Sequence, residues 1–182
     1  MRKESKLLTF DEFADELLAE SQPRALVILA SAKIDTQLRE VLEGFLWPKA
    51  GTVKDSDELF DGDGPLSTFS SRIKMALRLG IIDESFANAL DKLRDIRNKA
   101  AHWISFGVAE APLRDQLKNL QSLVAGRRSY KLTVSRFFTE GKLNDFESLQ
   151  AILLTLSVLL GSIHDTVPER SLPIIQKSIK VD

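Results

Sequence analysis

The chain has 182 residues, the size of one domain with short appendages, because compact domains usually contain about 100 to 150 residues. Hydrophobic residues make up 43% and charged residues 28%, a composition that predicts a packed core and excludes a disordered chain. The formal net charge is -1, so any binding of a polyanion must be local. There is no cysteine and there are only two histidines, which excludes disulfides, thiolate metal sites and multi-histidine sites. We therefore expect an intracellular protein that needs neither a metal nor a cofactor.

The apolar stretches are too short for targeting or membrane insertion. Acidic residues interrupt the N-terminal region from Asp11 onward, so no signal peptide is expected. The most apolar window, Leu149 to Ile163, is shorter than the roughly 20 residues that span a bilayer. It predicts a buried core helix, and we expect a cytoplasmic protein without a membrane partner.

Apolar residues recur at helical spacing along most of the chain, which predicts an all-α fold. A short helix is expected over Asp11 to Ala19, and the next begins at Ser21 to Pro23 and reaches about Leu46. Four more are expected over Ser67 to Leu79 with Ser67 as the cap, from the Asp83 cap toward Ala101, from Pro112 to about Val124, and from Asn144 or Asp145 to His164. The expected architecture is an up-and-down bundle of about six helices. Residues 1–20 would form an N-terminal appendage, 21–166 the bundle and 167–182 a C-terminal tail.

Two segments between the predicted helices carry concentrated charge. The long loop from Trp47 to Leu66 contains the acidic residues Asp55, Asp57, Glu58, Asp61 and Asp63. A calcium loop is disfavoured, because Leu59 and Pro65 occupy positions that should supply ligands. The segment from Gly126 to Gly141 contains the basic residues Arg127, Arg128, Lys131 and Arg136. We interpret the basic segment as a solvated turn or hairpin, with local contact to nucleic acid or a partner protein as the alternative.

The predicted helix after Asp83 contains an arginine where a core residue is expected. On a helical wheel Arg97 falls about 20° from Phe86, within the apolar stripe of Leu90, Leu93, Ala100 and Ile104. A guanidinium there must be paired, lie at an interface or line a notch, and Asp35 is a candidate for a structural ion pair.

Two further polar residues follow Arg97 on the same predicted helix. Asn98 and His102 share a face, whereas Arg97 and His102 lie about 140° apart. The arginine and the imidazole converge only if the helix bends or frays before His102, or if a second subunit supplies one of them. Such a pair would combine a phosphate-binding fork with a group that titrates near neutral pH.

The string from Arg97 to His102 resembles the R-x4-6-H signature of HEPN-type helical domains. The wider pattern resembles the mannitol operon repressor (MltR-like) family, which is related to HEPN domains. This resemblance rests on RALVILASAKID at 24–35, LFDGDGPLSTFSSRI at 59–73, LGIID at 79–83 and LRDIRNKAAH at 93–102. It covers about Ser21 to Asp165.

The resemblance implies two functions. As an MltR-like transcriptional regulator, the chain would be a non-enzymatic homodimer that acts through a protein partner, using the acidic loop or the basic segment. As a metal-independent HEPN-type endoribonuclease, it would hold the scissile phosphate with Arg97, use His102 as general acid or base, and orient one of them with Asn98. We favour the regulator. A helix-turn-helix that reads DNA is disfavoured, because Asp83 and Glu84 would approach phosphates with the wrong sign.

Overall fold

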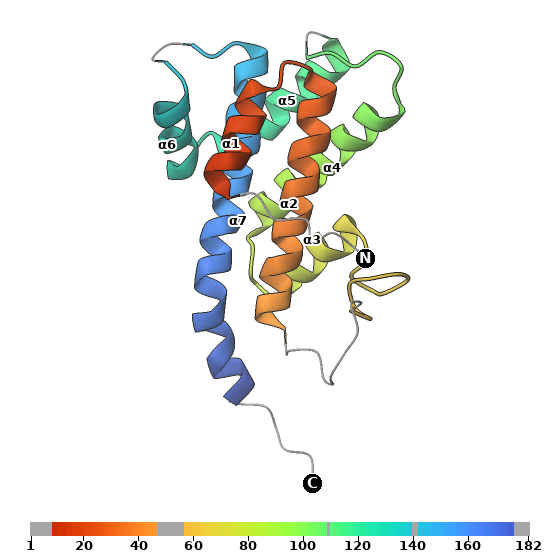
Figure 1. The fold of residues 1–182 in the computed structure, drawn as a ribbon, viewed down its shortest axis with the longest axis vertical. Coiled ribbons are helices and arrows are strands. Elements are labelled where there is room, and N and C mark those ends of the chain that lie inside the picture. Colours follow the sequence, from red (N-terminus) through yellow and green to blue (C-terminus); the bar gives the residue numbers. More distant parts are fainter. Residues whose placement is uncertain (1–8, 47–56, 109, 140–141, 177–182) are drawn as a thin grey trace.

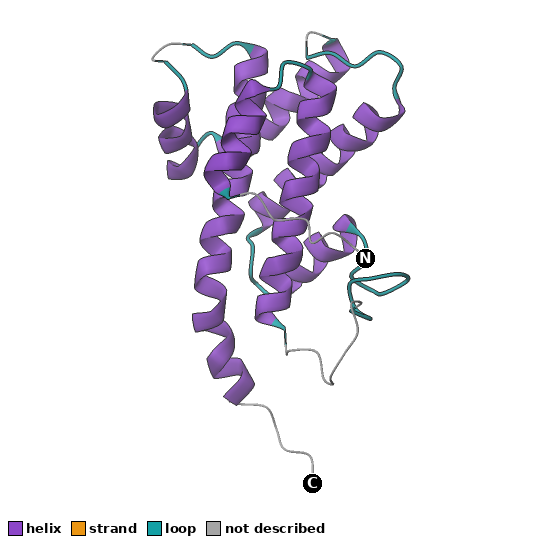
Figure 2. Cartoon of the chain, in the orientation of Figure 1, coloured by secondary structure: helices purple, strands orange, loops and turns teal. Residues whose placement is uncertain are grey.

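A computed structural model describes residues 9–46, 57–108, 110–139 and 142–176, with the backbone alone for 111–112 and 167–176. This part of the chain contains seven α-helices and no strand, which confirms the all-α bundle (Figures 1 and 2). The helices are α1 (Phe10–Ala19), α2 (Pro23–Phe45), α3 (Phe69–Arg78), α4 (Glu84–His102), α5 (Ala111–Val124), α6 (Arg128–Phe137) and α7 (Asp145–Gln176).

Helices α2 and α7 form the centre of the bundle and run in the same direction (Figure 1). Their middles are joined by two hydrogen bonds: the Gln37 amide donates to the Ser157 carbonyl oxygen at 3.2 Å, and the Ser157 hydroxyl donates to Gln37 Oε1 at 2.8 Å. The part of α7 up to Thr166 is long and apolar enough to cross a bilayer, but most of its side chains from Leu149 to Leu160 are buried in the bundle. We therefore interpret α7 as the core helix that the sequence predicted.

Helix α1 belongs to the hydrophobic core, although the sequence suggested an appendage. Phe13, Ala14 and Leu17 are fully or almost fully buried. The Gln150 amide of α7 donates to the Leu17 carbonyl oxygen at 3.2 Å. A capping box between Thr9 and Glu12 begins the helix, so its first amides are satisfied while its apolar face packs on α2 and α7.

The expected turn or hairpin in the basic segment is instead helix α6, and it adds a seventh helix to the six expected. Tyr130 and Thr133 face the core, and the Phe137 ring packs edge-on against Phe10 of α1 at 6.2 Å. Apolar residues alternate over 130–134, a pattern that is also compatible with the expected hairpin. The spacing from Tyr130 through Thr133 to Phe137 is that of a helical face, and it prevails because that face covers α7.

The structure defines three helix ends more closely than the sequence did. Helix α3 is capped by Thr68 rather than Ser67, and the Thr68 hydroxyl accepts from the Ser71 amide at 3.1 Å. Gly80 ends the turn after α3 with a φ of 68°, a left-handed conformation that favours glycine. Helix α7 passes Pro168 and continues to Gln176, so the first part of the expected C-terminal tail is helical.

Candidate functional site

Arg97 is exposed, although its direction on the helix falls among the buried residues of α4. The residues of α4 that face the core are Phe86, Ala87, Ala89, Leu90, Leu93, Ile96 and Ala100, while the side chain of Arg97 is exposed. Arg97 is therefore not a core residue, and it lines a cavity, which is one of the three environments expected for a guanidinium in this stripe. Ile104, assigned to the same stripe, lies beyond the end of α4 and is fully exposed.

Asp35 does form an ion pair, but its partner is Arg72 of α3 and not Arg97. Arg72 Nη1 lies 2.6 Å from Asp35 Oδ1, and the Arg72 side chain is almost entirely buried. Burial raises the pKa of the Asp35 carboxyl, and the charges of Arg72, Arg97 and Arg39 partly oppose that rise. Within the described residues no carboxylate lies within 4.0 Å of the Arg97 guanidinium, whose hydrogen bond goes to Asn98 Oδ1 at 3.3 Å.

Arg97 and His102 open onto different surfaces of α4. The helix is unbroken through His102, since the Trp103 amide still donates to the Lys99 carbonyl oxygen at 2.9 Å. The bend or fraying that would bring the two side chains together within one chain is therefore not present. Arg97 lines a cavity between α2 and α4, whereas His102 and Asn98 line a separate one of about 350 Å³.

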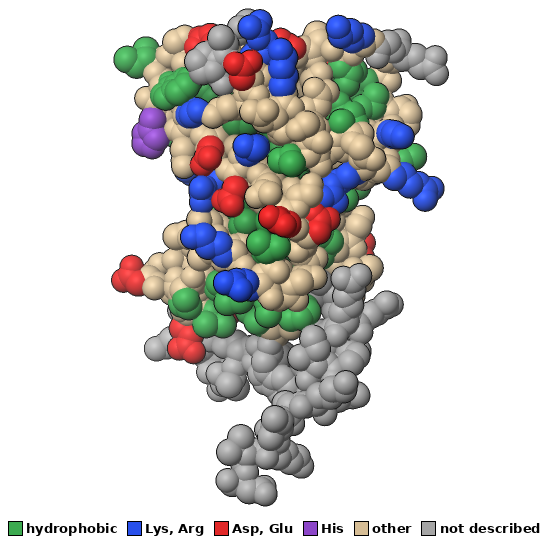
Figure 3. Space-filling view, turned by 180° about the vertical axis from the view of Figure 1, so that it is seen from behind, with side chains coloured by type: hydrophobic (Ala, Val, Ile, Leu, Met, Phe, Trp, Pro, Cys, Tyr) green, Lys and Arg blue, Asp and Glu red, His purple; other side chains and the backbone are tan. Residues whose placement is uncertain are grey.

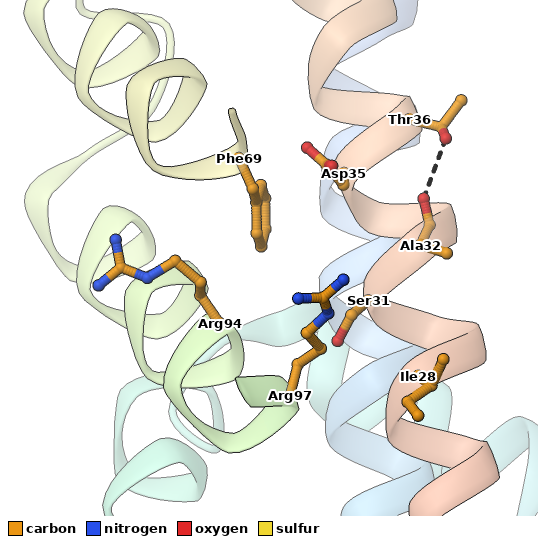
Figure 4. A pocket seen from close by; sticks show the side chains of 8 residues that line it. All are labelled: Ile28, Ser31, Ala32, Asp35, Thr36, Phe69, Arg94 and Arg97. Carbon is orange, nitrogen blue, oxygen red and sulfur yellow. Dashed lines mark hydrogen bonds between the residues drawn. The ribbon is translucent and has the colours of Figure 1, made fainter. Parts of the chain in front are cut away.

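The cavity that contains Arg97 lies between α2 and α4, with Phe69 of α3 at one side (Figure 4). It has a volume of about 390 Å³ and is lined by Ile28, Ser31, Ala32, Asp35, Thr36, Phe69, Arg94 and Arg97. The Arg97 guanidinium reaches across from α4 toward Ser31 and Asp35 of α2 (Figure 4). The Ser31 hydroxyl is buried and has no hydrogen-bond partner among the described residues.

A second cavity of about 540 Å³ lies next to the first and shares Ile28 with it. Its lining residues are Gln22, Pro23, Arg24, Ala25, Ile28, Ile104 and Phe106. We call the two cavities together the α2–α4 groove. Sequence reasoning missed the second cavity, because it depends on how the turn after α4 folds back onto α2. The available signal was that Ile28 is an apolar residue outside the predicted apolar stripe of Leu26, Ala30 and Ile34.

That turn is held against α2 by one arginine. Arg24 Nη2 donates to the carbonyl oxygens of Trp103 at 2.7 Å and Ile104 at 2.9 Å. The same guanidinium lies 6.0 Å from the centre of the Phe106 ring. The exposed side chain of Ile104 is therefore carried by a fixed backbone.

Two carboxylates of the acidic loop, those of Asp57 and Asp61, form contacts that stabilise the loop itself. Asp61 Oδ1 pairs with Arg39 of α2 at 2.7 Å, and this contact and the neighbouring Glu43 raise the pKa of Arg39. Asp57 Oδ1 accepts from the Leu59 amide at 2.8 Å. Glu58 and Asp63 are exposed, and Asp55 lies outside the described residues.

The basic segment is also partly neutralised by the fold. Arg127 donates to both carboxylate oxygens of Asp83, at 2.9 and 3.1 Å, and Arg136 donates to Asp11 at 2.9 Å. Arg128 and Lys131 are exposed. Basic and acidic side chains are interspersed on the face in Figure 3, so this face presents no broad basic surface.

No group of three or more histidine, aspartate or glutamate side chains suited to a metal ion occurs among the residues that the structure describes. The candidate functional site consists of the exposed residues of α4 and the α2–α4 groove.

The fold is an all-α bundle that is also found in solved structures of other proteins. A possible transcriptional regulator, YggD from Shigella flexneri, superposes with a TM-score of 0.61 at 16% identity, covering 86% of this chain and 99% of that one. The structure of the MtlR–HPr complex from Escherichia coli matches with a TM-score of 0.55 at 16% identity, covering 87% of this chain and 98% of the matched chain. No family model matches the sequence, and no curated protein does either. These likenesses fit an MtlR-like fold.

Proposed function

We propose that this chain is a cytoplasmic transcriptional regulator of the mannitol operon repressor type, which acts by binding a protein partner and not by catalysis. The observation that carries the proposal is the position of Arg97 and His102 on different surfaces of an unbroken α4. One chain therefore has no composite site in which the guanidinium holds a phosphate while the imidazole moves a proton. The fold shared with YggD and with the MtlR–HPr complex supports the regulatory and partner-binding parts.

The second candidate is the metal-independent endoribonuclease. Its support is the exposure of Arg97, Asn98 and His102 on consecutive turns of one helix, with Asn98 bonded to Arg97. Because the two catalytic candidates point apart within one chain, this function needs a second copy to complete each site. The two functions therefore make opposite predictions for variants of His102.

A biochemical assay separates the two candidates. Purified protein is incubated with mixed cellular RNA in EDTA, with His102→Ala, Arg97→Ala and the exposed control Arg114→Ala in parallel. We expect the RNA to stay intact in every sample. Cleavage by the wild type and Arg114→Ala that disappears in both other variants would overturn the proposal in favour of the ribonuclease.

A genetic assay tests the regulatory role itself. We expect deletion of the gene to change the abundance of a defined set of transcripts, and both the wild-type gene and His102→Ala to restore it. In parallel, calorimetry with purified HPr tests the protein found in the complex of related fold. Transcripts that the wild type restores and His102→Ala does not would contradict a non-enzymatic regulator.

A further inference from the structure

We propose that the α2–α4 groove is the surface that binds the partner, and that it takes a peptide segment with one acidic side chain beside Arg97 and apolar side chains on Ile28 and Ile104. This inference rests on the proposed function and specifies the chemistry of the partner. Its two halves, one apolar and one cationic, come from separate observations.

The apolar half is exposed and already formed. Ile28 is 42% exposed and Ile104 is 101% exposed, and both line the same cavity with Phe106. A single exposed isoleucine is ordinary, but two that line one open cavity form a patch of the kind that binds other proteins. Because Arg24 donates one hydrogen bond to the Trp103 carbonyl oxygen and one to that of Ile104, the backbone there is fixed and binding loses little backbone entropy.

The cationic half has one guanidinium without an acidic partner. Arg94 is neutralised by Asp91 and Asp95, with both N–O distances at 3.2 Å. Arg97 has no carboxylate within 4.0 Å among the described residues, and its bond to Asn98 leaves most of its donors unused. The cavity between α2 and α4 therefore contains one guanidinium, that of Arg97, without a carboxylate within 4.0 Å among the described residues.

Two side chains of α2, Ser31 and Asp35, determine which chemical group can bind next to Arg97. The Ser31 side chain is 4% exposed, and its unpartnered hydroxyl faces the cavity, so it can donate to an incoming oxygen (Figure 4). Asp35 lies on the same helix face, but Arg72 binds it at 2.6 Å and compensates its charge. A carboxylate between Arg97 and Ser31 would accept charge-assisted hydrogen bonds from both.

The shape favours a peptide over other occupants. The lining residues run along α2 from Pro23 to Thr36, a length of about 20 Å at 1.5 Å per residue, which is much longer than a small anion. Ile28 and Ile104 have apolar side chains, which cannot form hydrogen bonds or ion pairs with the phosphates of a nucleic acid. A second copy with its groove facing this one would bring two Arg97 side chains together and no unpaired groove carboxylate, since Asp35 is occupied by Arg72.

A peptide selection tests the chemistry of the groove directly. A displayed library of random twelve-residue peptides is selected on the wild-type protein and, separately, on Arg97→Glu. We expect wild-type binders to contain aspartate or glutamate next to leucine, isoleucine or phenylalanine. On Arg97→Glu the acidic position should change to lysine or arginine, which a merely structural role of Arg97 would not produce.

Affinities of the selected peptides complete the test. We expect Ile104→Ser to weaken wild-type binders about ten-fold or more. Arg114→Glu, which reverses an exposed charge on α5 that lines neither cavity, should change them less than about two-fold. Circular dichroism confirms that each variant folds. Binders without an acidic preference, or binders insensitive to Arg97→Glu and Ile104→Ser, would overturn the groove assignment. They would leave the proposed function standing if His102→Ala still restores the transcripts.

Two other results would also overturn the peptide as occupant. Light scattering that shows a wild-type dimer dissociated by Ile104→Ser would assign the groove to a second copy. Competition of the selected peptides by a 30-nucleotide RNA, lost in Arg97→Glu, would assign it to nucleic acid.

Discussion

Arg72 donates hydrogen bonds to three oxygens where the loop before α3 meets α2. Its Nε binds the Leu66 carbonyl oxygen at 2.8 Å, its Nη2 the Ser67 carbonyl oxygen at 2.7 Å and its Nη1 Asp35 at 2.6 Å. Arg72→Ala would leave a half-buried carboxylate and two carbonyls without their donor. We expect the free energy of unfolding to fall by about 3 kcal/mol, as for one partner removed from a buried ion pair. Urea unfolding measures this loss, and the exposed Arg78→Ala on the same helix should change stability by less than about 0.5 kcal/mol.

The loss in Arg72→Ala should depend on pH. Burial already raises the pKa of Asp35 above its ordinary value of 3.8, and removing Arg72 removes the largest opposing influence. Between the raised folded-state pKa and 3.8 the folded protein binds the Asp35 proton more tightly than the unfolded chain, so acidification stabilises the fold. The stability difference between wild type and Arg72→Ala should therefore shrink as the pH falls from 7.5 toward 4. If the difference is constant, or grows on acidification, Asp35 is not the group left unpaired.

The sequence located Arg97 on α4 but not its environment. With Phe86 as the reference, the arginine appeared central to the apolar stripe. On the wheel Arg97 lies between Phe86 and Leu90, which are both buried, so its direction on the helix does not explain its exposure. Arg97 is exposed because a cavity lies between α2 and α4 at its level, and a wheel of one helix cannot show where a neighbouring helix leaves space.

At the scale of the helices, Asp83 connects the start of α4 to α6. Its Oδ1 caps α4 by accepting from the Phe86 amide at 2.7 Å, and the carboxylate also binds Arg127. The hydrogen bond from Arg127 holds the pKa of Asp83 below its ordinary value, so this contribution is present at neutral pH and is lost as the pH falls through that lowered pKa.

Replacing Asp83 separates its two roles. Asp83→Ala should lower the free energy of unfolding by about 1 kcal/mol through loss of the cap, while Asp83→Ser should keep most of the cap and lose the contact with Arg127. Thermal unfolding at pH 7 and at pH 3 checks both variants. A loss in Asp83→Ser as large as in Asp83→Ala would show that the ion pair, not the cap, supplies the stability.

A substitution in helix α1 tests whether this helix is part of the hydrophobic core. Because Leu17 is fully buried against α2 and α7, Leu17→Ala should cost about 3 kcal/mol and shift the single unfolding transition of the whole protein. Leu18→Ala, which truncates a half-buried neighbour of the same type, should cost less. An unchanged main transition in Leu17→Ala would mean that α1 is an appendage, as the sequence suggested.

Six of the seven helices in the described residues could be predicted from the sequence, including the short α1 and α3, whereas α6 and the end of α7 could not. The helical periodicity of apolar residues in α2 and α7 follows from their position in the core. The structure also confirms Asp83 as the cap of α4. Helix α6 was missed because its β-branched and alternating residues favour a strand locally, and only contacts with α1 and α7 select the helix. The continuation of α7 past Pro168 was missed because proline usually ends a helix.

For the whole molecule, the formal charge of -1 and the use of basic residues inside the fold limit binding to nucleic acid. Arg127 and Arg136 are paired with acids, which leaves Arg128 and Lys131 as the members of the basic segment without an ion pair in the described part of the chain. Two phosphate contacts predict that the logarithm of the DNA-binding constant falls with the logarithm of salt concentration with a slope of about -2. Fluorescence anisotropy with a labelled duplex between about 50 and 200 mM KCl measures that slope, and Arg128→Gln with Lys131→Gln should abolish it. A slope of about -5 or steeper would require a cationic surface that this arrangement of charges does not provide, and would favour direct reading of DNA over a protein partner.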